Sequence, residues 1–170
     1  MKYLRFICIG LLITLGEHLQ AQINWVTFEE AVALNEEEPK RILIDLYTDW
    51  CGWCKRMDRD TYAKEEVIEL INEHFYAVKF NGEQRESVTF DDHTFEFVAN
   101  GRRGYHELAA ALMQNNMSYP TTVFMDEQTR IIQPLPGYMG PDAFLPILKY
   151  IGEGHYEHTP WEEYQNSTTN

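Results

Sequence analysis

The sequence predicts an α/β domain in which a central mixed sheet is flanked by helices. Short apolar segments of strand length alternate with segments whose apolar residues recur at helical spacing. One of the apolar segments, residues 41–47, has the nearly continuous pattern of a strand buried on both faces. Such a strand needs helices on both sides of its sheet, and the order of the segments supplies them.

The expected elements follow from local signals along the chain. Thr27 and Glu30 form a capping box, which predicts that a helix begins there and ends in the acidic run before Pro39. Residues 82–103 are polar with two alternating patches, and they predict a hairpin inserted after the second core strand. The remaining segments predict strands at 41–47, 76–80, 121–125 and 130–133, and helices at 54–58, 64–74, 104–115 and 142–151.

The first 21 residues have the layout of a secretory signal peptide. A short basic start precedes an apolar run at 6–15, and Ala21 offers a small residue for cleavage. The run is too short to span a bilayer, so we expect no stable membrane insertion after cleavage, although a retained anchor or a buried first helix is the alternative. We therefore predict a signal peptide at 1–21, a domain at 22–153 and a largely loose, polar C-terminal tail at 154–170.

The composition describes an acidic globular protein. The chain has 14 Lys and Arg against 27 Asp and Glu, a formal net charge of −13, and 44% of its residues are hydrophobic. This charge repels nucleic acid and anionic lipid, and it favours neutral or basic protein partners. We expect no nucleic-acid partner.

The cysteine count points to chemistry rather than to a structural disulfide. Of the 3 cysteines, Cys8 lies in the expected signal peptide, which leaves Cys51 and Cys54. A loop this small stabilises a fold little. A pair with this spacing at the start of a helix suits disulfide exchange, because the helix N-terminus stabilises the Cys51 thiolate. Cys54, one turn inward and less exposed, then resolves the mixed disulfide.

Three segments carry a resemblance to the thioredoxin superfamily. Residues 42–55 resemble its active-site segment, with an apolar strand, an acidic residue, a tryptophan just before the first cysteine, and Gly and Lys in their usual places. Residues 118–122 resemble its cis-proline loop. Residues 54–79 are similar to a subgroup that includes the C-terminal domain of the bacterial thiol:disulfide interchange reductase. The likeness implies a thioredoxin fold, from which the chain departs by the longer 82–103 region, an insertion after the second core strand.

The resemblance implies a proton-transfer role for two charged residues. Asp45 would be a carboxylate buried beneath the disulfide, with a raised pKa that suits it to take a proton from Cys54. Lys79 would lie on the neighbouring strand and bias the ionisation of Asp45. The alternatives are a strand-end acid that points to solvent and a solvated lysine at a sheet edge.

The resemblance also implies which residues contact a substrate. Pro120 would be cis, and its loop would place the Tyr119 backbone against an extended substrate segment. Trp50 would pack beside the site and shield it, and Gly52 would belong to the substrate-binding surface. Trp53 replaces the usual proline between the cysteines, which leaves the redox potential open.

A metal site is the main competing interpretation of the cysteines. His155 and His158 could supply two further ligands, but their distance along the chain is far greater than in finger-like sites. We expect both in the solvated tail, and we predict no metal ligands and no cofactor beyond the redox-active disulfide. His106, Arg102 and Arg103 are expected on a solvated face and receive no role.

These observations predict an exported thiol:disulfide oxidoreductase of the bacterial periplasm that reduces disulfides in substrate proteins. Because that compartment is oxidising, a reductase needs an upstream donor, for which a membrane electron-transfer protein is expected. A disulfide oxidant or isomerase is one alternative. A non-catalytic binding module or a carrier of copper or zinc is the other.

Overall fold

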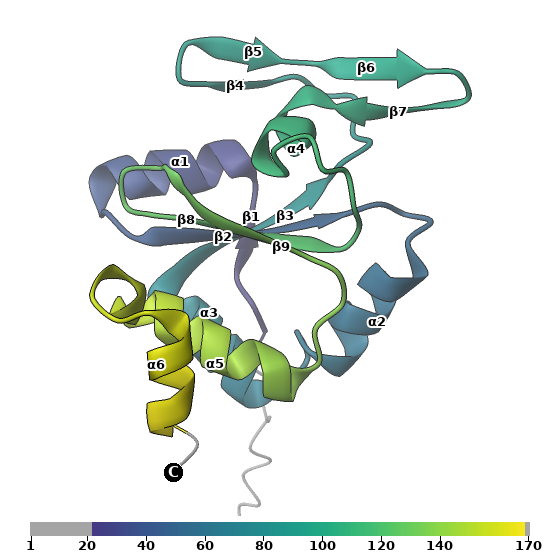
Figure 1. Ribbon diagram of the computed structural model, residues 1–170. Coiled ribbons are helices and arrows are strands. Elements are labelled where there is room, and N and C mark those ends of the chain that lie inside the picture. Colours follow the sequence, from purple (N-terminus) through teal and green to yellow (C-terminus); the bar gives the residue numbers. More distant parts are fainter. Residues whose placement is uncertain (1–21, 169–170) are drawn as a thin grey trace, which may run out of the picture.

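The computed structural model describes residues 22–168, so the signal peptide predicted at 1–21 lies outside the described residues. Figure 1 shows a central sheet with helices above and below it, and two hairpins beyond one helical layer. The strands are β1 (Trp25–Val26), β2 (Arg41–Tyr47), β3 (Phe75–Asn81), β4 (Val88–Phe90), β5 (His93–Phe95), β6 (Phe97–Asn100), β7 (Arg103–His106), β8 (Thr121–Met125) and β9 (Ile131–Pro136). The helices are α1 (Phe28–Glu37), α2 (Gly52–Asp60), α3 (Glu65–His74), α4 (Glu107–Leu112), α5 (Pro141–Gly152), the 3₁₀ turn η1 (His155–Glu157) and α6 (Trp161–Thr168). None of the helices within 22–168 has the length and apolar character needed to cross a membrane.

The main sheet has five strands in the spatial order β1-β3-β2-β8-β9. β1 and β2 run parallel to β3, whereas β8 is antiparallel to β2 and β9 is antiparallel to β8. This mixed sheet confirms the predicted α/β class. The central strand, β2, has the bounds expected from its apolar run, and all its residues between Arg41 and Tyr47 are buried.

Successive side chains of β2 enter the two separate cores of the domain. Ile42, Ile44 and Leu46 point to the face that α1 and α4 cover. Leu43 points to the opposite face, which α2, α3 and α5 cover. Asp45 follows Leu43 in this alternation, so its carboxylate enters the core on the side of α2.

The insertion after β3 is larger than the single hairpin predicted for 82–103. β4 pairs with β5 and β6 pairs with β7, and Figure 1 shows both hairpins beyond α1 and α4. The predicted start of the next helix was wrong, because Gly104 belongs to β7 and α4 begins at Glu107. A Cβ at Gly104 would lie 2.2 Å from the Phe97 ring, so the close pairing of β6 with β7 needs glycine at this position.

The prediction of a solvated His106 was also wrong, since this residue is fully buried between β7 and α4. Its Nδ1 accepts a hydrogen bond from the Leu108 N–H at 3.2 Å, so Nε2 carries the proton and donates to the Glu86 carbonyl at 3.1 Å. Burial lowers the pKa of His106 and keeps the ring neutral. The histidine therefore joins the insertion to the helix that follows it.

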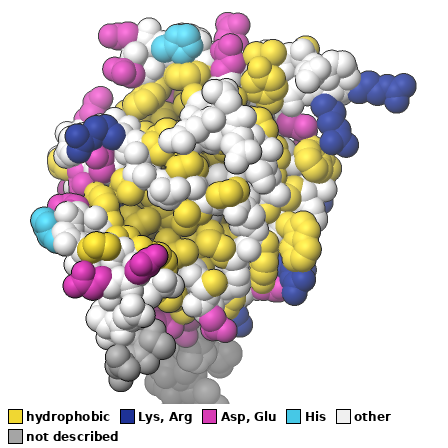
Figure 2. Space-filling view, viewed as in Figure 1, with side chains coloured by type: hydrophobic (Ala, Val, Ile, Leu, Met, Phe, Trp, Pro, Cys, Tyr) yellow, Lys and Arg dark blue, Asp and Glu magenta, His cyan; other side chains and the backbone are white. Residues whose placement is uncertain are grey.

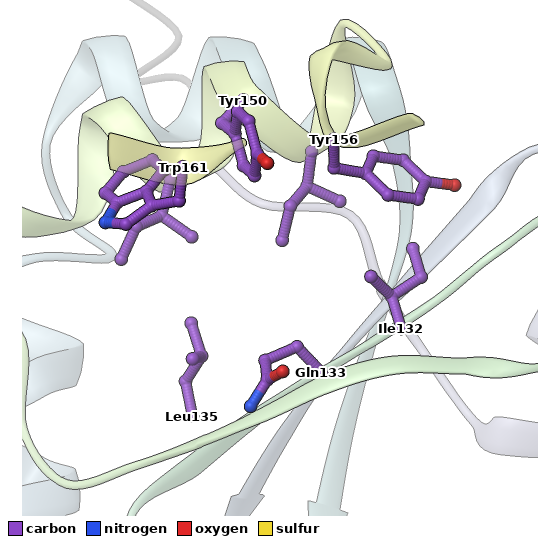
Figure 3. A pocket seen from close by; sticks show the side chains of 8 residues that line it. Ile132, Gln133, Leu135, Tyr150, Tyr156 and Trp161 are labelled. Atoms are coloured by element: carbon purple, nitrogen blue, oxygen red, sulfur yellow. The ribbon is translucent and has the colours of Figure 1, made fainter. Parts of the chain in front are cut away.

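The expectation of a loose tail at 154–170 is contradicted over η1 and α6. Tyr164 of α6 is only 8% exposed, and its ring centroid lies 5.0 Å from Tyr150 of α5 and 5.9 Å from Trp161. η1 and α6 help to enclose a mostly apolar pocket of about 410 Å³ against α5 and β9. Figure 3 shows Tyr150, Tyr156 and Trp161 on one side of this pocket and Ile132, Gln133 and Leu135 on the other. A few aromatic residues thus attach an otherwise polar segment to the domain.

Replacing Tyr164 by alanine tests this attachment. We expect Tyr164→Ala to lower the free energy of unfolding by about 2 kcal/mol, because it removes a buried ring from an aromatic cluster. Urea denaturation of the purified domain measures the change. The exposed Glu163 of the same helix provides the control, and a loss in Tyr164→Ala no larger than in Glu163→Ala would show that α6 adds nothing to stability.

Candidate active site

The two cysteines lie where the central strand passes into a helix. Cys51 is the N-cap of α2, and Cys54 lies in the first turn of that helix. Their sulfurs form a disulfide with an S–S distance of 2.07 Å and a Cα–Cα distance of 5.3 Å. The backbone N–H of Cys54 also donates a hydrogen bond to Cys51 Sγ, with an N–S distance of 3.0 Å. The chain therefore brings a dithiol pair to the N-terminal end of a helix.

This position has a chemical consequence for the reduced pair. The first N–H groups of a helix lack intrahelical partners, and the helix dipole places partial positive charge at the same end. In the reduced protein these groups stabilise a Cys51 thiolate, and the Cys54 N–H already points at that sulfur. Of the two sulfurs, Cys51 Sγ therefore has the position that favours a thiolate.

The exposure of the site differs from the expectation. Cys51 and Cys54 are 4% and 3% exposed, so the expected difference between them is absent in the disulfide form, where one bond holds both sulfurs in the same turn. The neighbouring aromatic residues are exposed instead, Trp50 to 52% and Trp53 to 56%. Gly52, between them, is also exposed. The surface around the disulfide is thus aromatic.

A proline loop lies beside the disulfide. β8 follows Pro120 directly and pairs with β2, so the loop reaches the end of the sheet from which the CxxC segment emerges. The peptide bond between Tyr119 and Pro120 is cis, and the Tyr119 ring packs edge-on against Trp50 at a centroid distance of 6.2 Å. The Pro120 carbonyl accepts a hydrogen bond from the Gly137 N–H at 2.8 Å. This bond ties the loop to the chain that leaves β9.

The start of the insertion is packed against the same loop. A Cβ at Gly82 would lie 2.0 Å from the Tyr119 hydroxyl, so the tyrosine can approach the backbone only because residue 82 is glycine. Within the described residues that hydroxyl is buried without a hydrogen-bond partner. Burial, with a smaller effect of Glu83, raises the pKa of Tyr119 to about 12. Tyr119 therefore stays protonated at neutral pH and forms a neutral wall of the site.

Asp45 is a buried carboxylate on the α2 side of the sheet, with 1% exposure. Its Oδ2 accepts a hydrogen bond from Lys79 Nζ at 2.7 Å, while its Oδ1 has no hydrogen-bond partner in the described part of the chain. Burial raises the pKa of Asp45, and the attraction of Lys79 only partly opposes that effect. A carboxylate of this kind binds a proton more readily than an ordinary aspartate does.

Lys79 connects Asp45 to a second acid. It pairs with Asp45 in the register of β2 and β3, and its Nζ also forms an ion pair with Asp58 of α2. Burial lowers the pKa of Lys79, but the two carboxylates outweigh that effect and the net shift is upward. Asp58 and Lys79 also line a cavity of about 500 Å³ together with Trp25 and Tyr62. The network therefore extends from a buried carboxylate to a hollow that can admit water.

Asp58 was not singled out from the sequence. It lies four residues after Cys54 in α2, so helical spacing puts both residues on one face of the helix, and that signal could have identified it. The contact of Arg103 with Trp50, with the guanidinium carbon 4.6 Å from the ring centroid, could not have been found in this way. This contact joins the end of the insertion to the CxxC segment, and these two segments lie far apart in the chain.

Within residues 22–168, no three or more His, Cys, Asp or Glu side chains are grouped so that they could hold a metal ion. His155 lies 3.0 Å from a Glu153 carboxylate oxygen, and its ring centroid is 4.9 Å from that of Tyr164. His158 is 82% exposed and lies 3.9 Å from Glu157. Both histidines thus interact within the C-terminal segment.

A disulfide at the start of a helix, after the central strand of a mixed sheet and beside a cis-proline loop, defines a protein of the thioredoxin fold with a thiol–disulfide exchange site. The chain belongs to the thioredoxin-like domain family, whose sequence model matches residues 28–152.

The curated relatives that match most of the chain are distant and much longer. The chain is 23% identical over 150 residues to an uncharacterized protein of Caenorhabditis elegans, a match that covers 86% of this chain and 18% of the relative. It is 27% identical over 131 residues to the thiol:disulfide interchange protein DsbD of Pseudoalteromonas atlantica, covering 75% of this chain and 19% of the relative. The chain thus spans less than a fifth of the length of these two proteins.

Solved structures agree with the fold. A thioredoxin-fold protein from Helicobacter pylori superposes with a TM-score of 0.56 at 27% identity, covering 76% of this chain and 80% of that one. A thioredoxin from Thermus thermophilus gives a TM-score of 0.57 at 19% identity, covering 82% of this chain and 99% of that one. The second likeness concerns the fold alone.

Proposed function

We propose that this protein is an exported thiol:disulfide oxidoreductase that reduces disulfides in substrate proteins. The observation that carries the proposal is the Cys51–Cys54 disulfide at the N-terminus of α2, next to the Tyr119–Pro120 loop. The name of the DsbD relative, a thiol:disulfide interchange protein, supports the same chemistry.

The reaction starts from the reduced pair. The Cys51 thiolate attacks one sulfur of a substrate disulfide, so a bond forms between Cys51 Sγ and that sulfur while the substrate S–S bond breaks. The second substrate sulfur leaves as a thiolate and takes up a proton. Before the attack, an extended substrate segment binds along Tyr119 and Pro120, with Trp50, Gly52 and Trp53 forming the surface around Cys51.

Cys54 completes the exchange. Its thiol gives a proton to Asp45, and the resulting thiolate attacks Cys51 Sγ, which restores the Cys51–Cys54 disulfide and expels the first substrate sulfur as a thiolate that takes up a proton from water. Asp45 suits this step because burial raises its pKa, and Lys79 and Asp58 offer a charged route from Asp45 toward the cavity beside them. Two electrons and two protons reach the substrate in each cycle.

A reductase outside the cytoplasm needs a donor that returns two electrons to the disulfide. We propose a membrane electron-transfer protein with a reactive dithiol as that donor. The signal-peptide pattern of residues 1–21 supports export to the periplasm.

The reduction potential tests the direction of the reaction. We expect the Cys51–Cys54 pair to equilibrate with glutathione at a potential near about −270 mV, as reductases of this fold do, and we expect the wild type to accelerate insulin reduction by dithiothreitol. A potential near about −120 mV would instead identify an oxidant. Absence of insulin turnover would contradict catalysis altogether.

A further inference from the structure

Each of the two exposed tryptophans beside Cys51 is in contact with the guanidinium group of an arginine. Arg103 of β7 lies over the Trp50 ring, with its guanidinium carbon 4.6 Å from the ring centroid. Arg56 of α2 lies 5.2 Å from the centroid of Trp53. These cations come from different elements, β7 and α2, and contact the tryptophans that precede and follow Cys51 in the chain. Since the tryptophans are more than half exposed, the guanidinium groups are presented to a docking partner together with the rings.

Further cations adjoin both arginines. The first turn of α2 adds Lys55, and the β6–β7 turn adds Arg102 next to Arg103, all of them exposed. Figure 2 shows Lys and Arg side chains at the upper right, where the β6–β7 turn lies, and at the lower right, near α2. This is unusual for a chain with a formal net charge of −13.

Several of these cations have no carboxylate partner of their own. Arg56 forms an ion pair with Asp60 at 3.1 Å, but no ion pair joins Lys55, Arg102 or Arg103 to an acid within residues 22–168. The Trp50 ring is also held by a hydrogen bond, which its Nε1 donates to Glu83 at 3.0 Å. The Trp50 ring is thus fixed in place with the unpaired guanidinium group of Arg103 over it, whereas Arg56 beside Trp53 also binds Asp60.

We propose that this aromatic and basic rim docks polypeptide segments that carry Asp or Glu next to the disulfide to be reduced. The inference rests on the proposed function, because it concerns the substrates of the same cysteine pair. Carboxylates beside the substrate cysteine would meet the guanidinium groups of Arg103 and Arg56, while the peptide backbone lies on the rings of Trp50 and Trp53. Lys55, Arg102 and Arg103, which form no ion pair within residues 22–168, attract such segments toward Cys51, while the acidic surface elsewhere repels them.

Three peptides test the proposal. They share one intramolecular disulfide and differ only in the residues that flank the first cysteine, which are Asp, Asn or Lys. The fully reduced protein is mixed with each peptide in excess, and its single-turnover oxidation is followed by tryptophan fluorescence. Each rate is divided by the rate with dithiothreitol, which corrects for the intrinsic reactivity of the peptide disulfide. We expect the Asp peptide to react about tenfold faster than the Asn peptide at low salt and the Lys peptide to react more slowly, with both differences shrinking as salt is added.

A pair of matched variants locates the effect. Arg102→Gln/Arg103→Gln is expected to remove most of the preference for the Asp peptide. Lys64→Gln/Lys149→Gln removes the same charge from a different surface, since Lys64 is the N-cap of α3 and Lys149 pairs with Glu66 of α3 at 3.1 Å, and it is expected to keep the preference. Equal corrected rates for the three peptides, or a preference that survives in Arg102→Gln/Arg103→Gln, would overturn the docking proposal alone. If the wild type reduces none of them, the proposed function itself fails.

Discussion

Cys54→Ser is expected to turn the protein from a catalyst into a trap. The Cys51 thiolate can still attack a substrate disulfide, but a serine hydroxyl cannot resolve the product, so the mixed disulfide accumulates. Cys51→Ser is expected to lower the rate of substrate reduction at least about 10³-fold, because it removes the attacking sulfur. The asymmetry follows from the position of Cys51 at the N-cap of α2 and of Cys54 within the first turn.

Mass spectrometry under non-reducing conditions measures both results. Each reduced variant is mixed with a peptide that contains one disulfide, and the adduct of protein plus peptide is quantified over time. Cys51→Ser/Cys54→Ser is the control for adducts through other groups. An adduct that forms with Cys51→Ser but not with Cys54→Ser would reverse the assigned roles.

Asp45→Asn is expected to slow the second half of the exchange about 10²-fold while leaving the first attack by Cys51 nearly unchanged. An amide cannot take the proton from Cys54, so the mixed disulfide persists longer. The effect should shrink at high pH, where the Cys54 thiol loses its proton to solvent. Stopped-flow measurements of attack and release across a pH series separate the two steps, and equal slowing of both would contradict the proton-acceptor role.

The same substitution is expected to stabilise the fold at neutral pH. Because burial raises the folded-state pKa of Asp45 above its unfolded value, the protein loses stability as pH rises from the unfolded value of about 3.9 through the folded pKa. An asparagine resembles the protonated carboxyl and avoids that loss. The urea midpoint of Asp45→Asn should therefore exceed that of the wild type at neutral pH, and the two should converge in acid.

Asp126 supplies a matched control, because the pKa shift of its carboxyl group has the opposite direction. This buried acid accepts hydrogen bonds from Arg130 Nε and from the Arg130 and Gln128 N–H groups. Burial alone would raise the pKa of Asp126, but those hydrogen bonds outweigh it and the net shift is downward. Its stabilising contribution is thus present above the unfolded pKa and is lost in acid. Asp126→Asn should lower the urea midpoint at neutral pH, and a similar rise in both variants would show that the Asp45 result is not electrostatic.

The sequence by itself determined the features that depend on neighbouring residues. The apolar run of β2 predicted a central strand with its observed bounds. Thr27 and Glu30 predicted the start of α1, and both hydrogen bonds of the capping box are present. The spacing of Cys51 and Cys54 predicted a disulfide at a helix N-terminus, because both residues fall within a single helical turn.

Tertiary structure alone decided the contacts between segments far apart in the chain. Lys79 reaches Asp58 of α2, and Arg103 reaches Trp50, because packing of α2 and of the insertion brings their side chains together. His106 is buried, and Tyr164 attaches a polar segment to α5. Helical spacing from Cys54 indicates Asp58 as a residue of interest, but it does not predict the partner of Asp58. The partner in each of these contacts depends on where two elements meet in space and not on the neighbouring residues in the chain.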